Sequence, residues 1–260
     1  MNYPKLSIIT INFNDSKGLE KTILSVRNQL FRNYEHIIID GGSKDDSKFI
    51  IEKYKDGFSK WVSEKDKGIY DAQNKGIKFA KGEYCLFLNS GDYLAEENVL
   101  DKIWIGNSYS HDILYGDMFV PTKNGKLRRL YQAKNMNLYH LFKDTIWHPS
   151  SFIRRELFQK IGLYSLNYKI CSDYEFWMKA FKLKYKFKYI HIPISVFNED
   201  GLSSKTENQR FVQEERKKIQ KEFSPISLYY LYSIILMINN SYLKLVSKIK
   251  SIIKKFLLNG

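Results

Sequence analysis

Carboxylate and amide side chains recur after apolar segments in the first half of the chain. In chain order they are Asn12 and Asn14, Asp40, Glu64 and Asp66, and Asn89 and Asp92. Such oxygen ligands suit a hard divalent cation, and a cation can bridge a carboxylate to a diphosphate. The glycine-rich phosphate loops of dinucleotide-binding and P-loop enzymes are absent from the sequence. The residues therefore predict a phosphate site that relies on a cation.

The elements that would position these side chains alternate between strands and helices. Residues 6–13 (LSIITINF) form an apolar run typical of a strand covered on both faces, and 35–39, 61–63 and 84–88 read as further strands. Apolar residues at helical spacing follow the first strand, at Leu19, Ile23, Val26 and Leu30. This alternation predicts an α/β fold with an open, mostly parallel twisted sheet. Ligands of such sheets bind beyond the carboxyl ends of the strands.

Helices are also expected from Asp45 onward and over 69–80, and the second half of the chain has a less regular pattern. Residues 112–120 and 147–153 read as strands, and 155–161 and 174–181 as helices. From Ser224 the composition is almost wholly apolar and basic. We therefore expect one main domain over residues 1–222 and a basic helical tail over 223–260.

The composition narrows the classes of protein. The chain has 260 residues, 2 cysteines and a formal net charge of +14. So few cysteines suit a reducing compartment, and no signal peptide or membrane-spanning run is evident, so we expect a cytoplasmic location. The charge fits an anionic membrane surface or phosphorylated substrates. Nucleic acid is not expected, because no nucleic-acid-binding motif is present.

Four blocks of sequence resemble family 2 glycosyltransferases. They are SIITINFN, IIIDGGSKDDS, DKGIYDAQNKGIKFAKGEYCLFLNSGD and HPSSFIRRELFQKIG…SDYEFW, and the resemblance covers roughly residues 5–205. It implies the GT-A fold and an inverting transfer of a hexose or N-acetylhexosamine from a nucleotide-diphosphate sugar, UDP-sugar above all. The pattern is most similar to bacterial enzymes of capsule, exopolysaccharide or O-antigen synthesis, whose acceptors are glycans, often lipid-linked.

The resemblance implies roles on the donor side. Asn12 and Asn14 would lie beside the nucleoside, and Asp40 would hydrogen-bond the base, with a turn residue as the alternative reading. Asp66 and Asp71 would belong to the segment that covers the donor. Capping of the following helix is the alternative for Asp66.

Asn89-Ser90-Gly91-Asp92 stands where the family has its metal-binding Asp-x-Asp motif. The match is imperfect, because Asn replaces the first Asp and Gly sits where the second often falls. We assign a Mn²⁺ or Mg²⁺ ion to Asp92 and a hydrogen bond to ribose or sugar to Asn89. We expect Gly91 to let the backbone approach the diphosphate. A plain strand-to-turn segment is the other reading.

Asp173 matches the family's catalytic carboxylate, at the start of a predicted helix. The resemblance implies that it takes the proton of the acceptor hydroxyl, while the alternative is an N-cap for that helix. Glu175 is the reserve candidate. His148, before Pro149, matches a motif near the acceptor site, although a lone His is often structural.

The last predicted element is a basic amphipathic helix within 241–258, rich in lysine and free of acid. It suits the inner face of an anionic cell membrane, where a lipid-linked acceptor would be found. Packing on the domain or a dimer contact is the alternative. For the whole protein, the alternative to a transferase is a non-catalytic module that keeps the fold and binds a membrane surface or polysaccharide.

Overall fold

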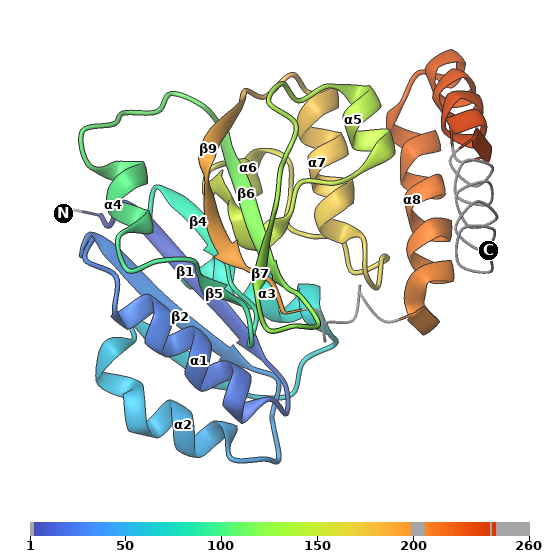
Figure 1. The fold of residues 1–260 in the computed structure, drawn as a ribbon. Helices are drawn as coiled ribbons and strands as arrows, with labels where there is room; N and C mark the ends of the chain where they lie inside the picture. The colour runs from blue at the N-terminus through green and yellow to red at the C-terminus, as the bar shows by residue number, and fades with distance from the viewer. Residues whose placement is uncertain (1–2, 199–205, 240, 243–260) are drawn as a thin grey trace, which may run out of the picture.

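A single mixed sheet forms the centre of the computed structural model (Figure 1), which describes residues 3–198, 206–239, 241 and 242. The strands run β3-β2-β1-β4-β8-β6-β9-β5, and β7 pairs with β6. Their bounds are β1 Leu6–Asn12, β2 Tyr34–Asp40, β3 Lys60–Ser63, β4 Tyr84–Phe87, β5 Tyr93–Leu94, β6 Ile113–Pro121, β7 Leu127–Leu130, β8 Ser151–Arg154 and β9 Phe187–Val196. The first four are parallel, as predicted.

Helices cover both faces of this sheet (Figure 1). They are α1 Ser16–Arg27, α2 Ser47–Tyr54, α3 Ile69–Phe79, α4 Val99–Trp104, α5 Leu138–Lys143, α6 Leu157–Lys160, α7 Ser172–Lys182 and α8 Gln209–Phe223. Side chains alternate between the faces of a strand. In β2, Ile38 therefore packs with the buried faces of α1 and α2, whereas Ile37 and Ile39 pack in the cluster that holds α3 and α7.

The second half of the sheet is joined to the first by an antiparallel strand. β8 pairs antiparallel with both β4 and β6, while β6 and β9 run parallel. The predicted strand over 147–153 is wrong in its first part, because His148–Ser150 form a 3-10 turn before β8. Pro149 explains the difference, since a proline has no N–H for a central ladder. The predicted helix over 155–161 shortens to α6.

Two smaller expectations at the start of the chain also change. Leu30 lies beyond the end of α1 and is 57% exposed, so it does not extend the buried stripe of that helix. Phe13 lies beyond β1 and is 64% exposed. It is therefore a surface residue at the end of the strand rather than part of the core.

The C-terminal part of the described chain packs beside α7. α8 contacts α7, and residues 226–239 form a further helix next to α8 (Figure 1). Tyr229, Tyr232 and Leu236 of this helix pack against the main hydrophobic core. Nearly all of the predicted basic helix over 241–258 lies outside the described residues.

Candidate active site

The ends of β1, β2 and β3 bring three polar residues into one row. The strand register aligns Asn12 with Asp40 and Asp40 with Ser63. The Asn12 amide donates to Asp40 Oδ1 at 2.7 Å, and the Ser63 hydroxyl donates to Asp40 Oδ2 at 2.7 Å. Two of the residues predicted to hold the nucleoside, Asn12 and Asp40, are thus in direct contact.

The carboxylate of Asp40 is buried and saturated with hydrogen bonds. Ser43 adds its hydroxyl to Oδ1 and its backbone N–H to Oδ2, so that each oxygen accepts two bonds. Burial opposes ionisation, but the donors from Ser43, Ser63 and Asn12 outweigh it and lower the pKa of Asp40. Asp40 is therefore an ionised carboxylate that links the ends of β1 and β3 to the loop after β2.

The loop beyond Asp40 is tied to the end of β1. Ser43 Oγ accepts the backbone N–H of Asn14 at 2.8 Å, and Asn14 Oδ1 accepts the N–H of Lys44 at 2.8 Å. Phe13, between the two asparagines, is an exposed aromatic ring beside Gly41. Sequence reasoning missed this ring, because the apolar run in which it stands resembles a buried strand.

Asp66 and Asp71 shape the turn between β3 and α3. Asp66 Oδ1 accepts the N–H of Gly68 at 2.8 Å, and Asp71 Oδ2 accepts the N–H of Lys67 at 3.0 Å. The other Asp66 oxygen lies over Gly41, where a Cβ would meet it at 2.5 Å. Asp66 therefore links this turn to the Asp40 loop, and a side chain at position 41 would separate them.

The Asn89–Asp92 segment forms a tight turn after β4. Gly91 has φ +91°, in the left-handed region that favours glycine, and its N–H donates to Thr22 Oγ1 at 3.0 Å. A Cβ on Gly91 would meet Asn198 Nδ2 at 2.4 Å. The absence of a side chain at Gly91 thus makes room for Asn198, a neighbour other than the diphosphate that we expected there.

Asp92 is almost completely buried at the base of this turn. Its Oδ1 accepts the backbone N–H of Asn198 at 2.9 Å, and its Oδ2 lies 3.8 Å from His148 Nε2. Burial raises the pKa of Asp92 to about 6, although the His148 charge and backbone donors act in the opposite direction. One carboxylate oxygen is thus held by the protein, while the other faces the imidazole.

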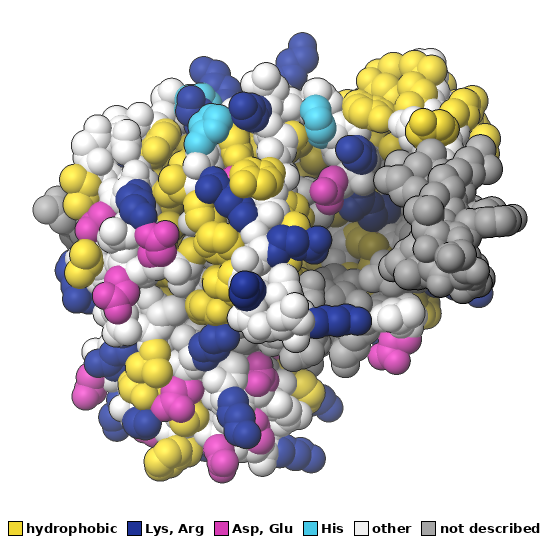
Figure 2. Space-filling view, in the orientation of Figure 1, with side chains coloured by type: hydrophobic (Ala, Val, Ile, Leu, Met, Phe, Trp, Pro, Cys, Tyr) yellow, Lys and Arg dark blue, Asp and Glu magenta, His cyan; other side chains and the backbone are white. Residues whose placement is uncertain are grey.

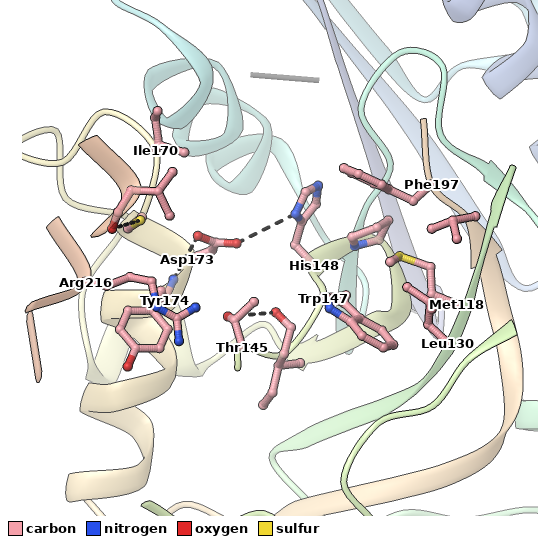
Figure 3. A pocket seen from close by; sticks show the side chains of 15 residues that line it. Met118, Leu130, Thr145, Trp147, His148, Ile170, Asp173, Tyr174, Phe197 and Arg216 are labelled. Carbon is pink, nitrogen blue, oxygen red and sulfur yellow. Dashed lines mark hydrogen bonds and ion pairs between the residues drawn. The ribbon is translucent and has the colours of Figure 1, made fainter. Parts of the chain in front are cut away.

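His148 joins the two halves of the site. Its Nδ1 lies 3.7 Å from Asp173 Oδ2, and its Nε2 is 3.1 Å from the Asn89 amide nitrogen. Figure 3 shows the Asp173 carboxylate and the imidazole turned toward each other. Burial by itself lowers the pKa of His148, but contact with Asp173 and the charge of Asp92 outweigh it and raise the pKa. Sequence reasoning named all four residues but could not show that they form one cluster.

Asp173 is held at the first turn of α7 by groups that sequence reasoning missed. Tyr70 of α3 donates its hydroxyl to Asp173 Oδ1 at 2.9 Å and also contacts the Ile170 carbonyl. The backbone N–H of Tyr174 donates to the same Oδ1 at 2.8 Å. Oδ2 remains turned toward His148, so one oxygen is fixed and the other faces the cavity beside it.

The loop before α7 is anchored from α8. The Glu215 carboxylate accepts the backbone N–H groups of Lys169, Ile170 and Cys171 at 2.7, 3.0 and 2.9 Å. Three such bonds fix the loop two residues before Asp173. A glutamate in a charged amphipathic helix gives no sequence signal for this role.

Glu175 does not reach the cluster. It is buried on α7 and its carboxylate pairs with Lys179 at 2.9 Å, and it is not among the residues that line the cavity beside Asp173. This placement gives no support to an acceptor-side role for Glu175. Helical geometry explains it, because residues two apart point to different sides of a helix.

The side chains of this site could supply only part of the coordination shell of a divalent cation. Among the described residues, no three His, Cys, Asp or Glu side chains are grouped so that they could hold a metal ion. Asp92 nevertheless offers a buried carboxylate whose Oδ2 faces the His148 imidazole at 3.8 Å. Magnesium commonly takes one or two protein carboxylates and completes its shell with substrate phosphates and water. The donor set suits that mode.

Comparisons with known proteins agree with this architecture. The family model described as glycosyl transferase family 2 matches residues 7–162. A PGL/p-HBAD biosynthesis glycosyltransferase of Mycobacterium tuberculosis is 30% identical over 220 residues, covering 82% of this chain and 84% of that protein. An uncharacterized glycosyltransferase of the same species is 37% identical over 182 residues, or 68% and 69% of the two chains.

Solved structures share the fold at low sequence identity. Staphylococcus aureus TarS 1-349 in complex with UDP-GlcNAc has a TM-score of 0.65 and 20% identity, over 84% of this chain and 71% of that one. The mannosyltransferase PcManGT of Pyrobaculum calidifontis, with GDP-Man and Mn²⁺, has a TM-score of 0.58 and 14% identity, over 76% and 57%. These similarities confirm the predicted GT-A fold.

Proposed function

Because the chain belongs to glycosyl transferase family 2, we propose that this glycosyltransferase moves a sugar from a UDP-sugar to an acceptor hydroxyl with inversion. The observation that carries this proposal is the set of polar residues at one edge of the sheet, which we call the polar rim. It runs from the Asn12–Asp40 contact to the cluster of Asp92, His148 and Asp173. Asn12 and Asp40 are the last residues of the neighbouring strands β1 and β2, and Asp92 follows the end of β4, at the edge where parallel sheets bind their ligands.

The nucleoside would lie at the Asp40 end of the rim. The exposed ring of Phe13 offers a flat surface on which uracil can stack. A bond from Asp40 to the uracil N–H requires Ser43 or Ser63 to turn its hydroxyl away, because both Asp40 oxygens are saturated. Asn14 and Asp66 would border the ribose and diphosphate. Binding of UDP-GlcNAc by the similar TarS structure supports UDP as the nucleotide.

Asp92 would hold the cation, with Asn89 beside the ribose or sugar. A Mn²⁺ or Mg²⁺ ion bound there would offset the negative charge that develops on the leaving diphosphate. The Mn²⁺ in the similar PcManGT structure supports this assignment. Asp92 would contribute its oxygen next to His148, while Asn198 keeps the other oxygen in place.

Asp173 would act as the general base. Its Oδ1 is fixed by Tyr70 and the N–H of Tyr174, which leaves Oδ2 to accept the proton of the acceptor hydroxyl. The hydroxyl oxygen then bonds to the anomeric carbon as the bond to the diphosphate breaks on the opposite side. UDP leaves, the configuration inverts, and the proton ends on Asp173. His148 would hold the two carboxylates on either side of the reacting centre.

The acceptor would be a glycan carried on a lipid, as in cell-surface polysaccharide synthesis, with the enzyme bound to the inner face of the membrane. Support comes from exposed apolar residues of the 226–239 helix, Ile226, Tyr230, Leu231, Ile234, Met237 and Ile238. Figure 2 shows apolar side chains gathered in this region. No helix among the described residues is long and apolar enough to cross a membrane.

The test is UDP release from a panel of UDP-sugars in the presence of Mn²⁺ and bacterial lipid extract, with Asp173→Asn as the comparison. We expect turnover to fall by roughly 10²–10⁴-fold in the variant, the usual range for loss of a general base. UDP affinity should stay within about threefold, because Asp173 is proposed to act on the acceptor hydroxyl and not to contact the nucleotide. If neither protein binds UDP, or if Asp173→Asn turns over at the wild-type rate, the proposal fails. A non-catalytic module would bind without turnover.

A further inference from the structure

A cavity of about 270 Å³ opens beside the Asp173–His148 pair (Figure 3). Both side chains belong to its lining, at the boundary with the polar rim described above. Since Asp173 must reach the acceptor hydroxyl, a group that fills this cavity belongs to the acceptor and not to the donor. The chemical character of the cavity wall therefore indicates which kind of acceptor group the cavity can bind.

Most of the wall is apolar and comes from the second half of the sheet. The β6 and β7 hairpin supplies Met118, Val120 and Leu130, and Trp147 and Phe197 complete the same side (Figure 3). Ile170 and Val212 face them from the α7–α8 side. Met118 and Val120 are 4% and 3% exposed, so this surface is part of a packed wall.

The polar side chains of the lining are largely committed to the protein itself. Thr145 donates to the Ile146 carbonyl, and Tyr174 donates to the Leu141 carbonyl. Arg216 donates from Nη2 to carbonyls at the end of α5, including that of Asp144 at 2.9 Å. A sugar ring enclosed here would leave hydroxyl groups short of partners, which is costly. An aryl ring or alkyl chain would need none.

We propose that this cavity binds an apolar aglycone, an aryl ring or a short alkyl chain, linked directly to the acceptor group that carries the reacting hydroxyl. The inference rests on the proposed transferase function and narrows its acceptor class. The acceptor hydroxyl would meet Asp173 at the mouth, and the apolar group would lie against Leu130 and Trp147. The volume of the cavity is just below the usual range of small-molecule pockets, about 300–1,000 Å³, which suits one ring or a short chain.

The experiment is calorimetric titration of the full chain, saturated with UDP and Mn²⁺, with paired phenyl and methyl β-glycosides of glucose, galactose and N-acetylglucosamine. We expect the phenyl compound of at least one pair to bind roughly tenfold or more tightly than its methyl counterpart, because the ring buries apolar surface. Quenching of Trp147 fluorescence should accompany binding and disappear in Trp147→Phe. Equal affinity within every pair would overturn the inference.

Leu130→Gln and Leu127→Gln form a matched pair on strand β7. Leu130 lines the cavity, whereas Leu127 does not and is 46% exposed. Leu130→Gln should abolish most of the phenyl preference and Leu127→Gln should retain it. UDP affinity shows that each variant is folded, and Leu130→Phe, which narrows the cavity without adding a polar group, should also weaken phenyl binding. A preference that survives both Leu130 variants contradicts the inference.

The same titrations separate this inference from the proposed function. If UDP binds and sugar is transferred while phenyl and methyl compounds behave alike, only the apolar subsite is wrong. If UDP does not bind to the wild-type protein, the proposed function fails and the acceptor inference fails with it.

Discussion

Tyr70 and Asp173 are joined by a hydrogen bond of 2.9 Å, from the tyrosine hydroxyl to the carboxylate, although they lie 103 residues apart. Tyr70 stands in the first turn of α3, within the segment expected to cover the donor, and Asp173 lies in the first turn of α7. The bond therefore connects the donor side of the site to the group proposed as the base. Neither residue's local sequence indicates the other.

Tyr70→Phe should lower kcat while leaving the KM for the donor nearly unchanged. Loss of the hydroxyl removes one of the bonds that orient Asp173 and leaves the bond from the Tyr174 N–H to Oδ1 in place. We expect a fall of roughly tenfold, in line with misplacement of a catalytic group. Steady-state kinetics would measure it. Tyr54→Phe makes the same chemical change at a tyrosine hydrogen-bonded to Glu20, away from the site, and should have little effect on kcat. An equal loss of kcat in both variants would contradict the proposal that Tyr70 positions Asp173.

Glu215→Gln should reduce both stability and kcat. The substitution places an amide group against three backbone N–H donors and thereby breaks part of the anchor of the 169–171 loop. A loss of about 1 kcal/mol in the free energy of unfolding is expected, because the bonds to Ile170 and Cys171 are partly buried. Urea denaturation and kinetics at a temperature where both proteins are folded would separate the two effects.

The neighbouring Glu214 provides the control for that experiment. It pairs with Arg210 at the surface, where ion pairs contribute about 0–1 kcal/mol. Glu214→Gln should therefore match the wild type in both measurements. If Glu215→Gln also keeps the wild-type kcat, the loop does not need this anchor to hold Asp173.

Cation-dependent UDP binding should weaken as the pH falls through about 6. Burial raises the pKa of Asp92 from its ordinary 3.8 to about 6, and a cation needs the ionised form, so protons compete with it below that pH. Well below the pKa the apparent Mn²⁺ affinity should drop roughly tenfold per pH unit. Calorimetry of UDP with Mn²⁺ from pH 5 to 8 would follow it. Asp92→Asn should lose the Mn²⁺ effect at every pH; a pH profile unchanged by this substitution would contradict the assignment.

The pH dependence of stability in the cation-free protein should have the opposite direction: the contribution of Asp92 to the free energy of unfolding should increase as the pH falls. A carboxyl whose folded pKa exceeds its unfolded value favours the folded state when protonated. Asp92 thus contributes stability below its ordinary pKa of 3.8, and that contribution is lost as the pH rises through about 6. Asp92→Asn should accordingly be at least as stable as the wild type at pH 7 without cation.

Exposed apolar residues of the 226–239 helix should mediate membrane binding. Leu231, Ile234 and Ile238 are 49%, 51% and 59% exposed, and we expect their joint replacement by Gln to reduce flotation with vesicles containing phosphatidylglycerol. Leu183→Gln, at an exposed leucine after α7, is the control. Zwitterionic vesicles should bind less well, because the chain carries a net charge of +14. Undiminished flotation of the triple variant would show that these residues do not mediate membrane binding.

The first half of the fold could be predicted because its signals are local. The apolar run of β1 and the polar residues that follow each strand indicate a parallel sheet, and the observed register then brings Asn12 and Asp40 together. The second half depends on pairings between distant segments. β8 joins β4 to β6, which its own sequence does not indicate. β9 contains Pro193, which is unusual inside a strand and weakens the sequence signal for one.

The residues of the candidate site were predictable by type but not by contact. Asp92 and Asp173 stand in motifs, whereas Tyr70, Glu215 and Phe13 act through tertiary neighbours or exposure. Glu175 shows the converse, since its motif position is suitable but its side chain pairs with Lys179. Sequence indicates where carboxylates gather, and packing decides which of them face the cavity.

The most direct test of the central claim is anomalous scattering from a crystal soaked with UDP and Mn²⁺. We expect a manganese peak within coordination distance of Asp92, diphosphate oxygens on the same ion, and the uracil beside Phe13 and Asp40. Manganese elsewhere, or uracil remote from the end of β2, would contradict the account.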